Sequence, residues 1–167
     1  MAPQAEGMDA GSYSQHRIGH AVALMSAQRH LPEYGSAQME HSVQPLFTIG
    51  YEETTQAAVL DALRAAGVTL LVDVRAIAAS RRPGFAKSQL AAGVAGVGIG
   101  YLHLRGLGTP AAGRLAARTG RHDELRRIYG EHLAGAEAGQ GLAQLADLVA
   151  SGQRVCLLCL ERQPHHC

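Results

Sequence analysis

The sequence predicts an α/β fold: a single small layered domain in which helices flank a mainly parallel sheet. Residues 69–74 are apolar on both faces, as expected for a strand buried inside a parallel sheet. An earlier apolar, β-prone run over 46–49 is separated from them by a stripe of helical spacing at Val59, Leu60 and Leu63. A strand, a helix and a strand in this order form a βαβ unit. With 47% hydrophobic residues, the 167-residue chain can bury one core.

The first half of this domain is expected to alternate strands and helices. In chain order we predict the strand over 46–49 closed by Gly50, a helix capped by Thr54 and ended at Gly67, the strand over 69–74, a loop over 80–84, a helix over 87–94, and a strand over 99–104.

The second half is expected to hold a long loop, two helices and the last strand. The glycines and the proline of residues 106–120 indicate a loop. Asp123 is expected to cap a helix with an apolar stripe from Leu125 to Leu133, and Leu142, Leu145 and Val149 indicate another that stops near Gly152. The last predicted strand covers residues 154–159.

Residues 1–45 show no sustained hydrophobic period, and we expect a mostly disordered extension before a domain over 46–167. Met39 is a candidate for the true start of that domain. No apolar run approaches the roughly 18–20 residues that cross a bilayer, and no secretory signal opens the chain. The three cysteines form no disulfide framework, so we expect a cytoplasmic protein without a membrane partner.

The charge is unevenly distributed, although the formal net charge is only +1. Between Arg75 and His122 there is no acidic residue, and the stretch holds eight basic ones. Such a block is either a solvated basic face or a site for phosphate, carboxylate or a nucleic-acid backbone. Tryptophan is absent and aromatic residues make up 4%, which supplies few platforms for stacking single-stranded bases.

Polar side chains lie at the end of every predicted strand, at the edge where open parallel sheets bind ligands. The candidates, in chain order, are Tyr51, then Asp73 and Arg75, then His103 and Arg105, and finally Cys159 and Glu161, with Ser80 and Arg81 in the loop after the second strand. Because Asp73, Arg75, Cys159 and Glu161 all lie at or just after the ends of parallel strands, we expect them to converge on one cleft. The alternative is that Asp73 and Arg75 only brace their own loops.

Cys156 and Cys159 are three apart on a strand, so their side chains point to opposite faces and cannot share one zinc ion. Cys156 is therefore expected to be a small buried apolar residue. Cys159, at the strand end, could join the terminal His165, His166 and Cys167 in a metal site. Their spacing matches no standard zinc signature, so no metal is assigned, and a frayed terminus is the alternative.

From Phe47 to Cys167 the chain resembles the bacterial and archaeal family called domain of unknown function 488. The residues that carry the resemblance are Thr48-Ile49-Gly50-Tyr51-Glu52, Leu71-Val72-Asp73-Val74-Arg75, Ser80-Arg81-Arg82-Pro83-Gly84-Phe85, Tyr101-Leu102-His103-Leu104, Leu107-Gly108-Thr109-Pro110, and Leu157-Leu158-Cys159-Leu160-Glu161 with Cys167. The resemblance implies a fold and candidate residues but no reaction.

Two departures from the family pattern stand out. Ala78 occupies the position where the family has a proline two residues before the serine. The family's last motif is Cys-His-Arg, whereas this sequence ends at Cys167, so we expect the chain to be truncated there, without the helix and strand that would follow.

Two function classes remain open. The first is an enzyme, or degenerate enzyme, acting on an anionic substrate such as a phosphorylated metabolite or nucleic acid. Its anion would be held by Arg75, Arg81 and Arg105, with Tyr51 and Ser80 as further binding residues, and its catalytic residues would be Asp73, His103, Cys159 and Glu161. The second is a non-catalytic module that binds nucleic acid or protein through the surface from Arg75 to Arg121. The sequence names no cofactor.

Overall fold

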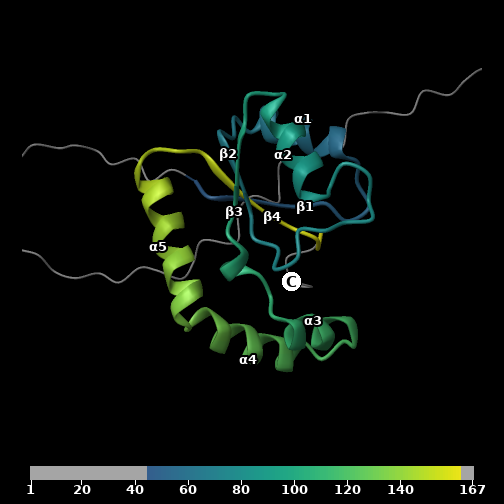
Figure 1. Cartoon of the computed structure of the whole chain (residues 1–167), viewed down its shortest axis with the longest axis vertical. Helices are drawn as coiled ribbons and strands as arrows, with labels where there is room; N and C mark the ends of the chain where they lie inside the picture. Colours follow the sequence, from purple (N-terminus) through teal and green to yellow (C-terminus); the bar gives the residue numbers. More distant parts are fainter. Residues whose placement is uncertain (1–44, 163–167) are drawn as a thin grey trace, which may run out of the picture. The chain divides into compact units, whose positions relative to one another are not determined.

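The computed structural model describes residues 45–162, which form a four-stranded parallel sheet with helices on both faces (Figure 1). The strand order is β1-β4-β2-β3, and every neighbouring pair is parallel. The strands are β1 (Phe47–Gly50), β2 (Leu70–Asp73), β3 (Gly100–His103) and β4 (Val155–Cys159). The predicted α/β class is confirmed. The predicted N-terminal extension, apart from Pro45, and the terminal residues His165 to Cys167 lie outside the described residues.

Two hydrophobic cores fill the spaces above and below the sheet. On one face, Leu71 and Leu158 pack with Val59 of α1 (Gln56–Ala65) and Leu90 of α2 (Lys87–Ala95). On the other face, the core includes Leu145 of α5 (Ala136–Ala150). All four residues of β2 are buried, as the two-sided apolar run predicted. After β3 the chain returns along this second face through α5, and β4 then pairs with both β1 and β2.

Cys156 is 2% exposed and belongs to the core beneath α1 and α2, which confirms its prediction as a small buried residue. Burial raises the pKa of its thiol to about 12, because the charged thiolate is poorly solvated there. Cys156 is therefore a protonated packing residue at neutral pH.

The predicted loop over 106–120 is wrong. A short 3₁₀ helix, η2 (Arg105–Leu107), overlaps the start of this range. Residues 111–118 form a full helix, α3 (Ala111–Arg118), which packs on α4 (His122–Leu133). The glycine and proline content concealed the helix. Pro110 stands just before its first residue, and Gly120, with a φ of 71°, follows its end, which are ordinary places for these residue types around a helix.

Two predicted helix caps are displaced. Thr55, not Thr54, is the N-cap of α1, and its side-chain oxygen accepts a hydrogen bond from the backbone N–H of Ala58. Helix α4 begins after Arg121, so Asp123 lies within its first turn and acts through the helix dipole instead of as a cap. None of the helices between residues 45 and 162 is long and apolar enough to cross a membrane.

The backbone of Gly108 lies against the loop that follows β2. A Cβ atom added to Gly108 would lie 2.1 Å from the backbone nitrogen of Ala76. Its φ of −84° is open to any residue, so space, not conformation, requires glycine here. This contact fixes the segment before α3 against the carboxyl end of the sheet.

We expect Gly108→Ala to lower the free energy of unfolding by about 2 kcal/mol, because backbone atoms cannot yield to the new methyl group without shifting. Gly130→Ala is the matched control: Gly130 lies inside α4, and nothing lies within 4 Å of the added carbon. That control should gain about 0.5–1 kcal/mol from helix propensity. Urea denaturation measures both. Equal effects of the two substitutions would contradict the packing argument.

Candidate functional site

The end of β2 carries a buried ion pair between Asp73 and Arg75. Asp73 is fully buried, and Arg75 is 8% exposed. The Arg75 side chain donates from Nε to Asp73 Oδ1 at 2.8 Å and from Nη2 to Oδ2 at 2.6 Å, which is a bidentate contact. The backbone N–H of Arg75 also donates to Oδ1 at 3.1 Å, and the hydroxyl of Tyr101 donates to Oδ2 at 2.6 Å. The two carboxylate oxygens of Asp73 thus accept four hydrogen bonds.

The remaining Nη1 donors of Arg75 hold the neighbouring elements. They reach the hydroxyl of Tyr51 at 3.1 Å and the carbonyl oxygen of Phe85 at 2.9 Å. Tyr51 and Phe85 stack with their ring centroids 4.4 Å apart, and the guanidinium of Arg75 lies 5.1 Å from the centroid of the Tyr51 ring. Arg75 therefore joins the end of β1, the end of β2 and the loop before α2.

Competing effects set the pKa values within this ion pair. Burial would raise the pKa of Asp73, but hydrogen bonds from Arg75 and Tyr101 outweigh it and hold that pKa below its ordinary value. Burial would lower the pKa of Arg75, but hydrogen bonds with Asp73 and Tyr51 raise it overall. Burial and the hydrogen bond to Asp73 both raise the pKa of Tyr101. At neutral pH, Asp73 is therefore negatively charged, Arg75 is positively charged and Tyr101 is neutral.

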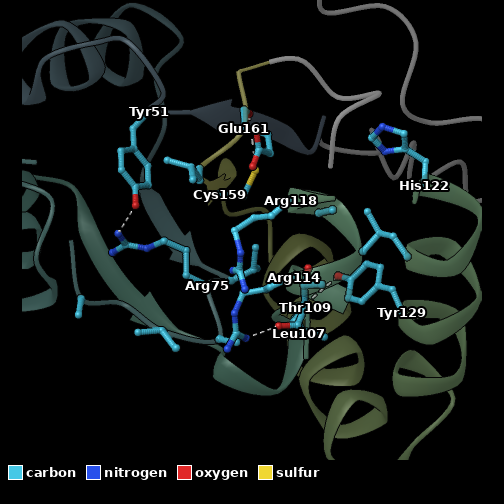
Figure 2. Close-up of a pocket in the computed structure, with 17 residues that line it drawn as sticks. Tyr51, Arg75, Leu107, Thr109, Arg114, Arg118, His122, Tyr129, Cys159 and Glu161 are labelled. Carbon is cyan, nitrogen blue, oxygen red and sulfur yellow. Dashed lines mark hydrogen bonds between the residues drawn. The ribbon is translucent and has the colours of Figure 1, made fainter. Parts of the chain in front are cut away.

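A cavity of about 570 Å³ lies beyond the carboxyl ends of β1, β2 and β4, and α3 and α4 line its other side (Figure 2). Its polar lining comes from both the sheet and the helices: Tyr51, Arg75, Thr109, Arg114, Arg118, His122, Tyr129, Cys159 and Glu161. The hydroxyl of Tyr129 donates to the carbonyl oxygen of Leu107 at 2.7 Å, which links α4 to the segment before α3.

The expected convergence of Asp73, Arg75, Cys159 and Glu161 on one cleft is wrong, because Asp73 and Cys159 face opposite sides of the sheet. Arg75, Cys159 and Glu161 line the cavity, but Asp73 does not. Asp73 is in register with Leu158, so it shares that residue's face of the sheet, while Cys159 is one residue further on and points to the other face. Arg75 joins the lining because it lies beyond the strand. The prediction for Asp73 was wrong because it assumed that side chains at the same edge of the sheet also lie on the same face.

Of the other predicted site residues, Tyr51 lines this cavity, and the remaining four, His103, Arg105, Ser80 and Arg81, do not. His103 is in register with Asp73, and its Nε2 lies 2.9 Å from the carbonyl oxygen of Arg75. Arg105 lines a second, smaller cavity of about 380 Å³. The hydroxyl of Ser80 accepts a hydrogen bond from the backbone N–H of Arg82 at 3.1 Å, and Arg81 is exposed in the same loop.

Arg114 and Arg118 are cavity residues that the sequence argument missed. They are four apart on α3, which places both on one face, and Figure 2 shows their side chains entering the cavity from that helix. Arg114 donates from Nη1 to the carbonyl oxygen of Thr109 at 2.7 Å. Within residues 45–162, neither arginine forms an ion pair with a carboxylate. The i, i+4 spacing of the two arginines could have indicated a shared helical face, but residues 106–120 were predicted to be a loop.

Cys159 is the last residue of β4, and Glu161 follows two residues later. Both line the same cavity. The Cys159 Sγ atom lies 3.7 Å from the backbone carbonyl oxygen of Glu161. The residues that the structure describes contain no group of three or more His, Cys, Asp or Glu side chains placed to hold a metal ion. The suggested partners of Cys159, the histidines and the cysteine at 165–167, fall outside those residues.

A family model with the description Domain of unknown function DUF488 matches residues 55–167 of this chain. The match covers β2, β3, β4 and every helix described above. No curated protein and no solved structure matches the chain.

The ion pair makes stability depend on pH. Because the pKa of Asp73 is lower in the folded state than its unfolded value of about 3.9, the pair stabilises the fold above that pH, and its contribution is lost as the pH falls through the folded-state pKa. We expect Asp73→Asn to cost about 3 kcal/mol at pH 7, because Arg75 is left buried without a counter-charge, and to flatten the acid dependence.

Urea denaturation at a series of pH values measures both effects. The control is Asp123→Asn, which removes the exposed carboxylate paired with Arg126 and should change stability little. An Asp73→Asn variant with the same pH profile as the wild type would contradict the role of this ion pair.

Proposed function

The chain belongs to the family Domain of unknown function DUF488, and we propose that it is an enzyme that binds a small anionic substrate in the cavity beyond the strand ends. The observation that carries the proposal is the pair Arg114 and Arg118. Two guanidinium groups on one helical face line the cavity without a carboxylate ion pair among residues 45–162. Such groups bind phosphate or carboxylate by charge-assisted hydrogen bonds.

The surroundings of Arg114 favour its use as a fixed binding group. One of its donors already contacts the carbonyl oxygen of Thr109, which orients the guanidinium, and its other donors remain for a ligand. Within residues 45–162 the side chain of Arg118 makes no hydrogen bond and no ion pair with a carboxylate, so all of its donors are available to an anion. The buried Arg75 has a different part in the proposal. It is a positioning residue, because four of its five side-chain donors are used by Asp73, Tyr51 and Phe85.

Cys159 and Glu161 are the residues that we assign to the chemistry. Both line the cavity that contains the arginines. The thiolate is the reactive form of cysteine, and positively charged surroundings favour it. We assign Cys159 as the nucleophile and Glu161 as the group that moves a proton to or from the substrate. Asp73 has no catalytic part, because its oxygens accept four hydrogen bonds away from the cavity.

The alternative, a module that binds nucleic acid or protein through the basic stretch, has less support. The stretch does not act as one surface. Arg75 is buried against Asp73, Arg121 pairs with Glu124, and the side chain of Arg82 points to backbone carbonyl oxygens. Binding of a DNA duplex with a steep salt dependence would favour this alternative over a small-molecule site.

We expect inorganic pyrophosphate to raise the Tm of the protein, because a ligand of the native state stabilises it. Arg118→Gln should weaken pyrophosphate binding roughly tenfold, the loss expected for a hydrogen bond to a charged group. The matched control is Arg126→Gln, another exposed arginine on a helix, outside the cavity lining. Calorimetric titration of each variant measures the affinities. The same loss in both variants would overturn the assignment.

Alkylation tests Cys159 without a known substrate. In a Cys167→Ser background, we expect anionic iodoacetate to label Cys159 several-fold faster, relative to neutral iodoacetamide, than it labels an unstructured peptide thiol. Arg118→Gln should reduce that preference, and salt should weaken it. Peptide mass mapping separates Cys159 from Cys156, whose burial should keep it unlabelled. A preference that survives Arg118→Gln would contradict the proposal that Arg118 gives Cys159 positively charged surroundings.

A further inference from the structure

We infer that the substrate is an amphiphilic anion, a phosphate or carboxylate group attached to a single alkyl or aryl body. This inference rests on the proposed function and adds the chemical class of the substrate. It follows from the other part of the cavity wall, which is aliphatic. Val74, Leu107 and Leu125 line the cavity from the end of β2, from η2 and from α4.

The rim of the cavity carries apolar side chains that the fold leaves uncovered. Residues 45–162 contain four exposed large hydrophobic side chains, and two of them line this cavity: Ile77, 58% exposed, and Leu160, 43% exposed. Ile77 lies in the loop after β2, and Leu160 directly follows β4, so they come from the ends of neighbouring strands. A ligand that covers both would remove apolar surface from water, which favours binding.

The lining argues against a strongly polar substrate such as a nucleotide sugar. The hydroxyl groups of a sugar would lose their water partners against aliphatic side chains, at a cost in binding free energy. A ligand with its charge at one end instead places the anion at Arg114 and Arg118 and its apolar body against Val74, Ile77 and Leu160. The cavity volume of about 570 Å³ falls within the range of roughly 300–1,000 Å³ that is typical of sites for single small molecules.

The test is a calorimetric titration with inorganic phosphate and with ethyl, butyl and hexyl phosphate, with hexanol as the uncharged arm. We expect affinity to rise roughly two- to fourfold for each added methylene group until the cavity is filled. Hexanol should bind much more weakly than hexyl phosphate, because the anion supplies part of the affinity.

Ile77→Ser should flatten the dependence on chain length and leave the affinity for inorganic phosphate unchanged. The matched control is Leu142→Ser, which alters a leucine of similar exposure, 45%, on α5 and outside the cavity lining. Because both residues are exposed, both variants should fold, and their Tm values check this. Leu160→Ser provides a second test from the other side of the rim.

The outcomes separate this inference from the function on which it rests. If phosphate binds through Arg118 but affinity does not change with chain length, the inference is wrong and the anion site stands. If the Leu142→Ser control flattens the series as Ile77→Ser does, the inference is also wrong. If neither phosphate nor any alkyl phosphate binds, or if hexanol binds as tightly as hexyl phosphate, the proposed anion site itself fails.

Discussion

A buried charge pair, Asp73 with Arg75, is the contact on which the site depends. An isolated carboxylate or guanidinium inside the protein would be strongly unfavourable, so each group requires the other. Their bidentate contact fixes the guanidinium, whose remaining donors then hold Tyr51 and the backbone of Phe85. The ends of β1 and β2 and the loop before α2 are joined in this way. The wall of the cavity that these segments form is consequently built before any ligand enters.

The two sides of the cavity have different roles in this account. The sheet side supplies Cys159 and Glu161 at the end of β4, on a backbone held by neighbouring parallel strands. The helical side supplies the cations of α3, a helix that packs on α4 and is set against the sheet by the close contact of Gly108 with Ala76. Side chains from the end of a strand and from a separate helix therefore line one cavity.

Most of the fold could be predicted from the sequence, because short apolar runs separated by helical stripes have few other interpretations. The candidate site was harder to predict. Alternation along a strand gives the face of each side chain, but only the register between strands, unknown from one sequence, shows that Asp73 and Cys159 face opposite ways. Helix α3 was missed because local composition outweighed periodicity in a short alanine-rich segment. Arg114 and Arg118 were missed with it, and His103 and Arg105, chosen as strand-end residues, lie outside the cavity.

The central claim is that Arg114 and Arg118 together form the anion site of this domain. Nuclear magnetic resonance of the arginine Nε–H groups, in ¹⁵N-labelled protein titrated with hexyl phosphate, tests it most directly. We expect the signals of Arg114 and Arg118 to shift and saturate together at one affinity, while the signal of Arg126 stays in place. Small shifts spread over all exposed arginines without saturation, or saturation at Arg81 and Arg105 instead, would contradict it.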